Sequence, residues 1–346
     1  MKKRLILVSA LTLTSFGTLA DGPNLYGRLD LALSNSDTAA TIRNNKDGTV
    51  LENNLSRLGL KGSESLTSNI ELLYQIEFGV ESMTETESSS GDRETFTSRD
   101  TFLGIKSPIG TVLVGSNGSA FKVSEGGIDA FGSTNADIDR LLIGQSPSRD
   151  GIWYYSPKIA DLITINATYL IEDNYIDASD DDAVNAYHDQ YTLNVMVGDK
   201  KLKAQPYYLV GAYTTLDGVD AYRAAGQVKI GHFKLGGIYQ NTKSQTTTKE
   251  GDTYLVSVAY NLNGVNLKAQ YGKDTAGFGR YYSKITDESA TDINVQTLTV
   301  GADYKITKST MLYGHYAMYE GDHKVAGATV DLDDDNIVTF GMRYNF

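Results

Sequence analysis

The chain has 346 residues, no cysteine and a formal net charge of −12 at neutral pH. The lack of cysteine excludes disulfides, thiolate metal sites and cysteine nucleophiles. The acidic balance argues against nucleic acid as a partner, because binding to phosphates needs clustered positive charge. Tyrosine and glycine are abundant, at 23 and 34 residues, and proline is scarce, at 5, which favours strands over helices.

Residues 1–20 have the three parts of a secretory signal peptide. Met1-Lys2-Lys3-Arg4 is a basic start, an apolar run follows from Leu5 to Leu13, and small residues lead to Ala20. The apolar run is about half as long as a membrane-spanning helix. We therefore predict cleavage after Ala20, with residues 21–346 forming one barrel domain. Losing Lys2, Lys3 and Arg4 changes the formal charge from −12 to −15.

The segments after the signal peptide alternate between apolar and polar residues. Near the start, Leu29, Leu31 and Leu33 alternate with Arg28 and Asp30. The same period recurs over residues 71–81, 163–169, 265–271 and 338–346. Each of these segments is predicted to be a strand with one apolar face. A soluble β-sandwich and a membrane barrel would both show this pattern.

The lengths of the connections favour the barrel. Short links occur near residues 107–110, 198–200, 231–232, 263–264 and 307–309. Long polar links occur near residues 35–54, 82–95, 116–149, 172–188, 242–252, 273–291 and 320–335. Short turns at one end and long loops at the other are typical of outer-membrane barrels. The predicted fold is an all-β, antiparallel transmembrane β-barrel of about sixteen strands.

The strand near Asp100 fits this pattern least well. Asp100 has the same parity as Phe102 and Gly104, so its carboxylate would point outward, where lipid penalises charge. Two explanations stay open. Either this strand faces another subunit, or its register shifts.

A barrel of this size is wide enough to contain an aqueous channel. A cationic side chain that faces lipid costs about 2 to 4 kcal/mol, so basic residues within strands should point inward. Arg28, Arg57, Lys61 and Arg99 all oppose the apolar parity of their segments. We interpret them as a cluster along one inner wall. The alternative is that they are unrelated pore-lining charges.

Three segments resemble the general porin family of Gram-negative bacteria. They are Leu25-Tyr26-Gly27-Arg28, Ser56-Arg57-Leu58-Gly59-Leu60-Lys61-Gly62 and Arg99-Asp100-Thr101-Phe102-Leu103-Gly104-Ile105-Lys106. The resemblance covers essentially the whole chain after residue 20. It implies a sixteen-stranded barrel, a homotrimer, and a third long loop that folds inward and narrows the pore.

The resemblance also implies a ladder of wall arginines that faces carboxylates on the third loop. Arg28, Arg57 and Arg99 match the ladder, and Arg149, in Ser148-Arg149-Asp150-Gly151, is a further candidate. The terminal aromatic residue, Phe346, with Tyr344 beside it, is implied to be part of the membrane-insertion signal. The last strand is expected to pair with the strand of Arg28 and close the barrel.

The third long loop is expected to run from about Ser116 to Ser148, and a connection of this length is usually functional. Its candidate carboxylates for the constriction are Glu125, Asp129, Asp137 and Asp139. Asp129 is the first choice and Glu125 the second. The loop departs from the family pattern at Ala130-Phe131-Gly132-Ser133, where relatives often have a proline, an acidic residue and glycines.

The sequence predicts a passive channel for ions and small hydrophilic solutes, with no cofactor, no metal and no enzymatic activity. The net charge favours weak cation selectivity. The expected partners are further copies of the chain, outer-membrane lipids and lipopolysaccharide. One alternative is an adhesin or structural anchor with a plugged lumen. Another is a hydrolase, in which His315 would meet a serine at the lipid-facing rim.

Overall fold

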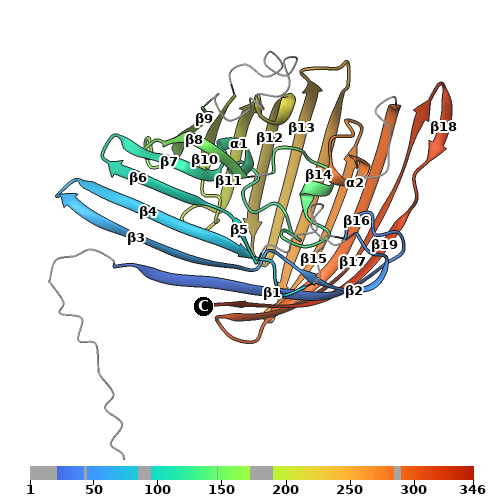
Figure 1. Cartoon of the computed structure of the whole chain (residues 1–346), viewed down its shortest axis with the longest axis horizontal. Coiled ribbons are helices and arrows are strands. Elements are labelled where there is room, and N and C mark those ends of the chain that lie inside the picture. The colour runs from blue at the N-terminus through green and yellow to red at the C-terminus, as the bar shows by residue number, and fades with distance from the viewer. Residues whose placement is uncertain (1–21, 43–44, 85–94, 146, 172–189, 284–289) are drawn as a thin grey trace, which may run out of the picture.

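The structure is a computed structural model, and it describes residues 22–42, 45–84, 95–145, 147–171, 190–283 and 290–346. The predicted signal peptide and the predicted loop at 172–188 lie outside these ranges. The described residues form one antiparallel sheet, with two four-residue helices, α1 (Ala120–Val123) and α2 (Arg280–Ser283) (Figure 1). None of the helices in the described ranges is both long and apolar enough to span a bilayer.

The strand segments are β1 (Asn24–Ser36), β2 (Gly48–Asn53), β3 (Arg57–Thr67), β4 (Ile70–Val80), β5 (Phe96–Ser98), β6 (Thr101–Ser107), β7 (Gly110–Gly118), β8 (Pro147–Tyr155), β9 (Ile163–Leu170), β10 (Tyr191–Gly198), β11 (Tyr207–Thr214), β12 (Val219–Ile230), β13 (Phe233–Ser244), β14 (Glu250–Leu262), β15 (Val265–Asp274), β16 (Thr291–Lys305), β17 (Thr310–Val325), β18 (Ala328–Asp331) and β19 (Asp335–Asn345).

The sheet closes into a barrel where the last strand meets the first. β19 pairs with β1 from Arg28 opposite Asn345 to Ser36 opposite Ile337. Beyond the ladder, Phe346 and Gly27 exchange backbone hydrogen bonds of 3.1 and 3.0 Å. A closed barrel leaves no unpaired sheet edge in the membrane, as the bilayer requires. The predicted pairing of the last strand with the strand of Arg28 is confirmed.

The nineteen segments in the described residues occupy sixteen positions around the wall. β2 and β3 both pair with β1, one after the other along its length. In the same way, β5 and β6 share the edge of β4, and β18 and β19 share the edge of β17. Three positions are thus each built from two segments. This confirms the predicted sixteen-stranded antiparallel barrel.

The apolar faces of the strands point outward. On β1, Leu29 and Leu33 are 40% and 54% exposed, whereas Asp30 between them is 0% exposed. On β19, Phe340 is 67% exposed and Thr339 is 0% exposed. A soluble sandwich would bury the apolar set in its core. The inverted pattern is that of a barrel whose outer surface faces hydrocarbon.

The wall is irregular at Asp100, between β5 and β6. Phe78 lies opposite Ser98 in the β4–β5 ladder, but Gln75 lies opposite Phe102 in the β4–β6 ladder. The pairing therefore shifts by one residue between Ser98 and Phe102. Such a bulge breaks the period of two, so the parity of Phe102 does not extend to Asp100. Of the two explanations, the structure supports the shift in register.

Short turns connect the strands at the end of the barrel where Gly22 and Phe346 lie. The turns at 108–109, 231–232 and 263–264 have two residues each, as predicted. The predicted turn at 198–200 is longer and runs over residues 199–206. At the other end, the predicted long loop at 242–252 is limited to residues 245–249, because β13 and β14 extend into it. Residues 215–218 form another short connection at that end.

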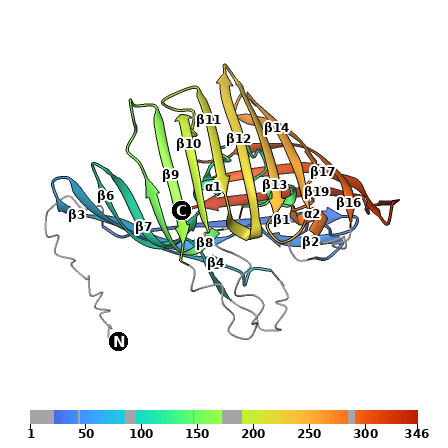
Figure 2. The same cartoon turned by 90° about the horizontal axis from the view of Figure 1, so that it is seen from above.

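The chain between β7 and β8, called loop three below, is described over residues 119–145 and lies inside the barrel (Figures 1 and 2). Its residues Ile128 and Leu142 form an apolar cluster with Tyr208 on β11 and Leu255 on β14. The inner face of β11 is therefore apolar, unlike the polar inner face that alternation alone predicts. The reason is that loop three covers it and excludes water.

Candidate functional site

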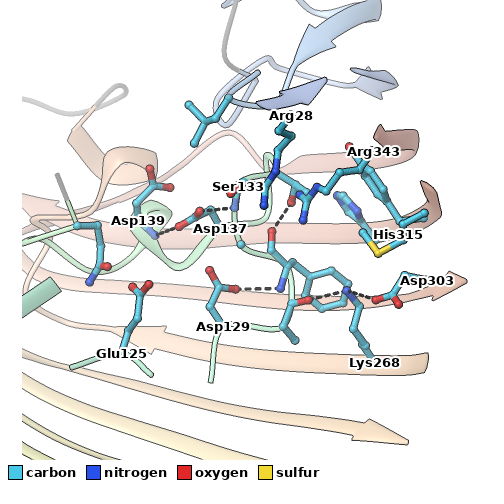
Figure 3. Close-up of a pocket in the computed structure, with 18 of the residues that line it drawn as sticks. Arg28, Glu125, Asp129, Ser133, Asp137, Asp139, Lys268, Asp303, His315 and Arg343 are labelled. Atoms are coloured by element: carbon cyan, nitrogen blue, oxygen red, sulfur yellow. Dashed lines mark hydrogen bonds and ion pairs between the residues drawn. The ribbon is translucent and has the colours of Figure 1, made fainter. Parts of the chain in front are cut away.

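Four arginines form a basic wall on the side of the barrel that includes the β1–β19 seam. Arg28 is on β1, Arg57 begins β3, Arg343 is on β19, and Arg99 lies at the break between β5 and β6. Arg28 and Arg57 are direct neighbours across the β1–β3 ladder. All four line one cavity of about 640 Å³, which residues of loop three also line. Figure 3 shows two of the four, Arg28 and Arg343, with the carboxylates of loop three. We call the four arginines the arginine wall.

Glu77 on β4 orients two members of the arginine wall. Arg99 Nε lies 2.6 Å from Glu77 Oε1, and Arg57 Nε lies 3.5 Å from Glu77 Oε2. The Tyr26 hydroxyl donates to the same Oε2 at 2.9 Å. Glu77 is 5% exposed. A buried carboxylate without a cationic partner is strongly destabilising, so the ion pairs with Glu77 restrict the positions of both guanidinium groups. The alternation placed Glu77 on a polar face but did not identify these partners.

Asp30 on β1 has the same role for Arg343. Asp30 is 0% exposed, and it accepts hydrogen bonds from Arg343 Nε and, at 2.8 Å, from the Tyr313 hydroxyl. Arg28 differs, since its Nε donates to Asn345 Oδ1 at 3.2 Å. Within the described residues, Arg28 has no carboxylate within ion-pair distance. Its charge therefore faces the cavity without neutralisation.

Arg223 on β12 holds both ends of loop three. It is 2% exposed. Its Nη1 donates to the Phe121 carbonyl at 3.1 Å and to Ser124 Oγ at 3.3 Å, and its Nη2 donates to the Ile143 carbonyl at 3.3 Å. The guanidinium lies 4.0 Å from the centre of the Phe121 ring, and Gln240 Oε1 accepts a further bond at 2.6 Å. Sequence reasoning missed this residue.

Asn135 joins the tip of loop three to the seam. It is 0% exposed, and its Nδ2 lies 2.6 Å from Glu52 Oε2, 2.9 Å from Thr339 Oγ1 and 3.1 Å from Ser34 Oγ. Its Oδ1 lies 2.7 Å from His315 Nε2. The loop is thus attached to β1, β2, β17 and β19 through one side chain. His315 lies inside the barrel, away from the lipid-facing rim where the hydrolase hypothesis needs it.

The four predicted loop carboxylates line the same cavity as the arginine wall. Two of them also shape the loop. Asp129 accepts the Phe131 N–H at 2.9 Å, and Asp137 accepts the N–H groups of Ser133 at 2.6 Å and Asp139 at 3.0 Å. Ser133 has a positive φ of 70° and sits in a tight turn. The segment that departs from the family pattern therefore ends in a turn that Asp137 caps.

The other two loop carboxylates contact basic or amide groups. Asp139 lies 3.2 Å from Arg140 Nη1 and 3.3 Å from Arg280 Nη1. Glu125 is linked to Arg223 through the amide of Gln145. Burial, together with the charge of Asp137, raises the pKa of Glu125 to about 7. Burial and the charges of Asp137 and Glu125 also raise the pKa of Asp129. At neutral pH Glu125 therefore carries less negative charge than a count of acidic residues suggests.

Several basic residues of the cavity were absent from the predicted set. One of them is Lys268 on β15. Its Nζ lies 3.0 Å from Asp303 Oδ2 and donates to the Ala130 carbonyl at 2.6 Å. The same Nζ lies 4.6 Å from the centre of the Phe131 ring. The others are Lys122, Arg280, Lys305 and Arg343. Lys268 and Arg343 both lie on the polar parity of predicted strands, so extending the parity argument to every strand would have found them.

Two predicted wall residues do not line this cavity. Lys61 is exposed, and its Nζ lies 4.6 Å from the centre of the Tyr26 ring, beside a separate pocket. Arg149 is exposed on β8, where the ladder with β7 shifts between Gly115 and Asn117. Because the register shifts there, the inward parity of the rest of β8 does not extend to Arg149.

The two predicted insertion-signal residues lie at the seam. The rings of Tyr344 and Phe346 stack with centroids 5.9 Å apart. The Phe346 ring also lies over Gly27, where an added Cβ would collide with it. Glycine at this position therefore leaves room for the terminal aromatic ring. The role of this pair in membrane insertion stays a prediction.

A closed sixteen-position barrel with an apolar exterior and a charged inner cavity defines an outer-membrane channel protein. A model of the Gram-negative porin family matches residues 7–324. The chain belongs to this family. It is therefore an outer-membrane channel that crosses the membrane with many strands, and not an enzyme.

Relatives and solved structures agree with this assignment. The major outer membrane protein P.IB of Neisseria lactamica is 24% identical over 374 residues, covering 100% of both chains. The P.IB protein of Neisseria meningitidis serogroup A is 25% identical and covers 90% of this chain and 91% of its own. An anion-selective porin from Comamonas acidovorans has a TM-score of 0.67 at 18% identity, covering 94% of this chain and 99% of its own. Salmonella typhi OmpF has the same TM-score at 13% identity, covering 94% and 97%.

Proposed function

We propose that loop three and the arginine wall form the constriction of a passive diffusion channel for ions and small hydrophilic solutes. The observation that carries this proposal is the shared cavity, which Arg28, Arg57 and Arg99 line together with Glu125 and Asp137. Opposed charges across a narrow aqueous gap produce a transverse field that filters charged solutes. No covalent step is involved.

We further propose that the constriction prefers anions. Eight basic residues line the cavity against five acidic ones. Two further carboxylates, Glu77 and Asp30, pair with three of the wall arginines, which leaves a formal excess of one positive charge. The raised pKa of Glu125, about 7, increases this excess at neutral pH. The expectation of weak cation selectivity came from the charge of the whole chain, but selectivity depends on the charges at the narrow point. One structural neighbour, from Comamonas acidovorans, is described as anion-selective.

The test is conductance in a planar lipid bilayer with a salt gradient. An open channel gives discrete steps of current, and an anion preference gives a reversal potential of the corresponding sign. A barrel that inserts but gives no steps would support the plugged anchor instead. A reversal potential that favours cations would overturn the proposed anion preference and leave the channel itself intact.

We propose that the chain assembles as a homotrimer in the outer membrane. One structural neighbour, OmpT of Vibrio cholerae, is described in a trimer form. The exposed apolar side chains of the outer face suit contacts with lipid and with other subunits. Native mass spectrometry in detergent would test this assembly, and a monomeric mass would contradict it.

A further inference from the structure

A second cavity, of about 580 Å³, lies at the short-turn end of the lumen. It is lined by the two-residue turn between β12 and β13, by the ends of β14 and β15, and by the connection 199–206. Asp129, Ala130, Lys268 and Asp303 line both this cavity and the constriction. The two spaces are therefore adjacent. In outer-membrane barrels the short turns face the periplasm, so this cavity lies at the periplasmic mouth.

Lysines converge on this second cavity. Lys201 and Lys203 come from the connection 199–206, and Lys229 and Lys234 come from the two sides of the β12–β13 hairpin. Within the described part of the chain, Lys201, Lys203 and Lys229 have no carboxylate within ion-pair distance. We call these four residues, together with Lys268, the lysine vestibule.

The lysine vestibule has little negative charge to balance it. Its acidic lining residues are Asp129 and Asp303. Asp303 is already paired with Lys268 at 3.0 Å. The Asp129 carboxylate is turned into loop three, where it accepts the backbone N–H groups of Phe131 at 2.9 Å and Ile138 at 3.4 Å. A concave surface lined by one sign of charge concentrates ions of the opposite sign.

The connection that carries Lys201 and Lys203 is firmly folded. The Asp199 carboxylate accepts the backbone N–H groups of Lys201 and Lys203, both at 2.9 Å, and of Ala204 at 2.8 Å. These bonds lower the pKa of Asp199 to about 2, so the carboxylate stays ionised and the turn stays capped at physiological pH.

Contacts with the barrel interior fix the same connection beneath loop three. Gln227 Nε2 on β12 donates to the Lys200 carbonyl at 2.6 Å. Leu202 packs against the apolar cluster that contains Ile128 of loop three. These contacts therefore hold Lys201 and Lys203 at the rim of the cavity. Their positive charge lies beside the path between the constriction and the periplasm.

We propose that the lysine vestibule is a binding site for small multivalent oxyanions at the periplasmic mouth, and that it makes their passage depend on direction. This inference rests on the proposed channel function. An anion that enters from the periplasm meets unpaired lysines before the constriction. An anion that enters from the opposite side meets the constriction first, where Asp30, Glu77 and Asp139 are paired with arginines.

The test is inhibition of single-channel chloride current by inorganic pyrophosphate, added to one side of an oriented bilayer at a time, in about 0.1 M salt. At this salt concentration the Debye length is about 10 Å, so the lysine charges still act across the cavity. Periplasmic addition should inhibit the current at a concentration about tenfold lower than addition from the other side, in line with electrostatic enrichment of ligands. The difference should disappear at about 1 M salt, where the Debye length is about 3 Å.

The variant Lys201→Gln/Lys203→Gln/Lys229→Gln should remove this difference between the two sides. All three side chains are exposed, so the barrel should fold, which heat-dependent mobility on gels would verify. A single substitution, Lys203→Gln, should reduce the difference between the two sides. Its matched control is Lys308→Gln, which also removes one lysine charge. Lys308 is exposed in the turn between β16 and β17 and lines neither cavity.

Each outcome decides a different point. Equal inhibition from both sides in the wild type, in channels that conduct, would overturn the vestibule proposal and leave the channel function standing. The same holds if Lys308→Gln reduces the asymmetry as much as Lys203→Gln. A wild-type protein that inserts without conducting would instead overturn the proposed channel function itself.

Discussion

The side-chain amide of Asn135 donates a 2.6 Å hydrogen bond to Glu52 Oε2, which connects the tip of loop three to the wall beside the first strand. The two residues are 83 positions apart in the chain. At the other side of the lumen, Arg223 holds both ends of the same loop. The loop that borders the constriction is therefore fixed at two places, and its position follows from a few buried polar contacts.

The first prediction concerns Asn135. The variant Asn135→Ala removes the contacts of the loop tip with Glu52, Thr339 and His315. Glu52 and Thr339 keep their contacts with the Ser34 hydroxyl, whereas His315 Nε2 loses the Asn135 amide, and an unsatisfied buried group costs about 1 to 3 kcal/mol. We expect the loop tip to detach, with larger and noisier single-channel currents. Asn24→Ala is the control, because Asn24 is exposed at the start of β1. Currents as quiet as those of the wild type would show that other contacts are sufficient to hold the tip.

The second prediction concerns Arg223. Arg223→Met keeps most of the side-chain volume but removes the contacts to Phe121, Ser124 and Ile143. We expect a loss of about 3 to 5 kcal/mol in barrel stability, as for a broken buried charged contact, measured by denaturant unfolding. The control, Arg280→Met, removes a half-exposed ion pair with Asp139 and should cost about 1 kcal/mol or less. Equal losses in the two variants would argue against an anchoring role for Arg223.

The third prediction tests the arginine wall. Removing Arg57 and Arg99 alone would leave Glu77 buried without its cations, so the informative variant is Arg57→Ala/Arg99→Ala/Glu77→Gln. It should raise conductance and move the reversal potential toward cations, because the lining loses two positive charges and one negative charge.

The matched control for this variant is Lys61→Ala/Arg149→Ala. Both residues were predicted from the sequence to belong to the wall, but they lie outside the cavity lining. We expect this control to conduct like the wild type. If it shifted selectivity as strongly as the triple variant, the constriction would not be where the cavity places it.

The fourth prediction concerns pH. Burial raises the pKa of Glu125 to about 7, so the carboxylate gains a proton as pH falls through neutrality. The lining then loses negative charge, and anion preference should increase between about pH 8 and about pH 6. Reversal potentials over this range measure the effect. In Glu125→Gln this step should be absent, and an unchanged pH profile in that variant would assign the titration to another group.

The fifth prediction concerns Phe346. Deleting it removes the two backbone bonds to Gly27 and the ring that lies over that glycine. We expect slower barrel closure and lower amounts of folded protein in the outer membrane, measured by heat-dependent gel mobility. Gly27→Ala should give a similar defect, because its Cβ would collide with the Phe346 ring. Normal assembly of the deletion variant would contradict the implied insertion signal.

Sequence alone was sufficient for the barrel because alternation, which marks the strands, and connection lengths, which favour a barrel over a sandwich, can both be read locally along the chain. Leu29 and Leu33 on one side of the chain, with Arg28 and Asp30 on the other, already indicate which face meets lipid. The same argument places Arg57 inside. Arg99 also lies inside, but Phe102, against which its parity was judged, lies across a bulge and pairs with Gln75 on the polar face. Alternation failed as a guide where the period of two is broken, at the bulge before Phe102 and at the shifted ladder beside Arg149.

Composition and alternation thus determined the all-β class, and connection lengths with the family resemblance determined the number of strands, the closing partner of the last strand and three of the four arginines of the arginine wall. Only the tertiary structure decided which charges are already neutralised, as with Glu77, and which stay free, as with Arg28. It also decided that Arg223 and Asn135 hold loop three. These contacts join residues 80 or more positions apart, and such pairings depend on how the closed barrel folds the loop across its lumen.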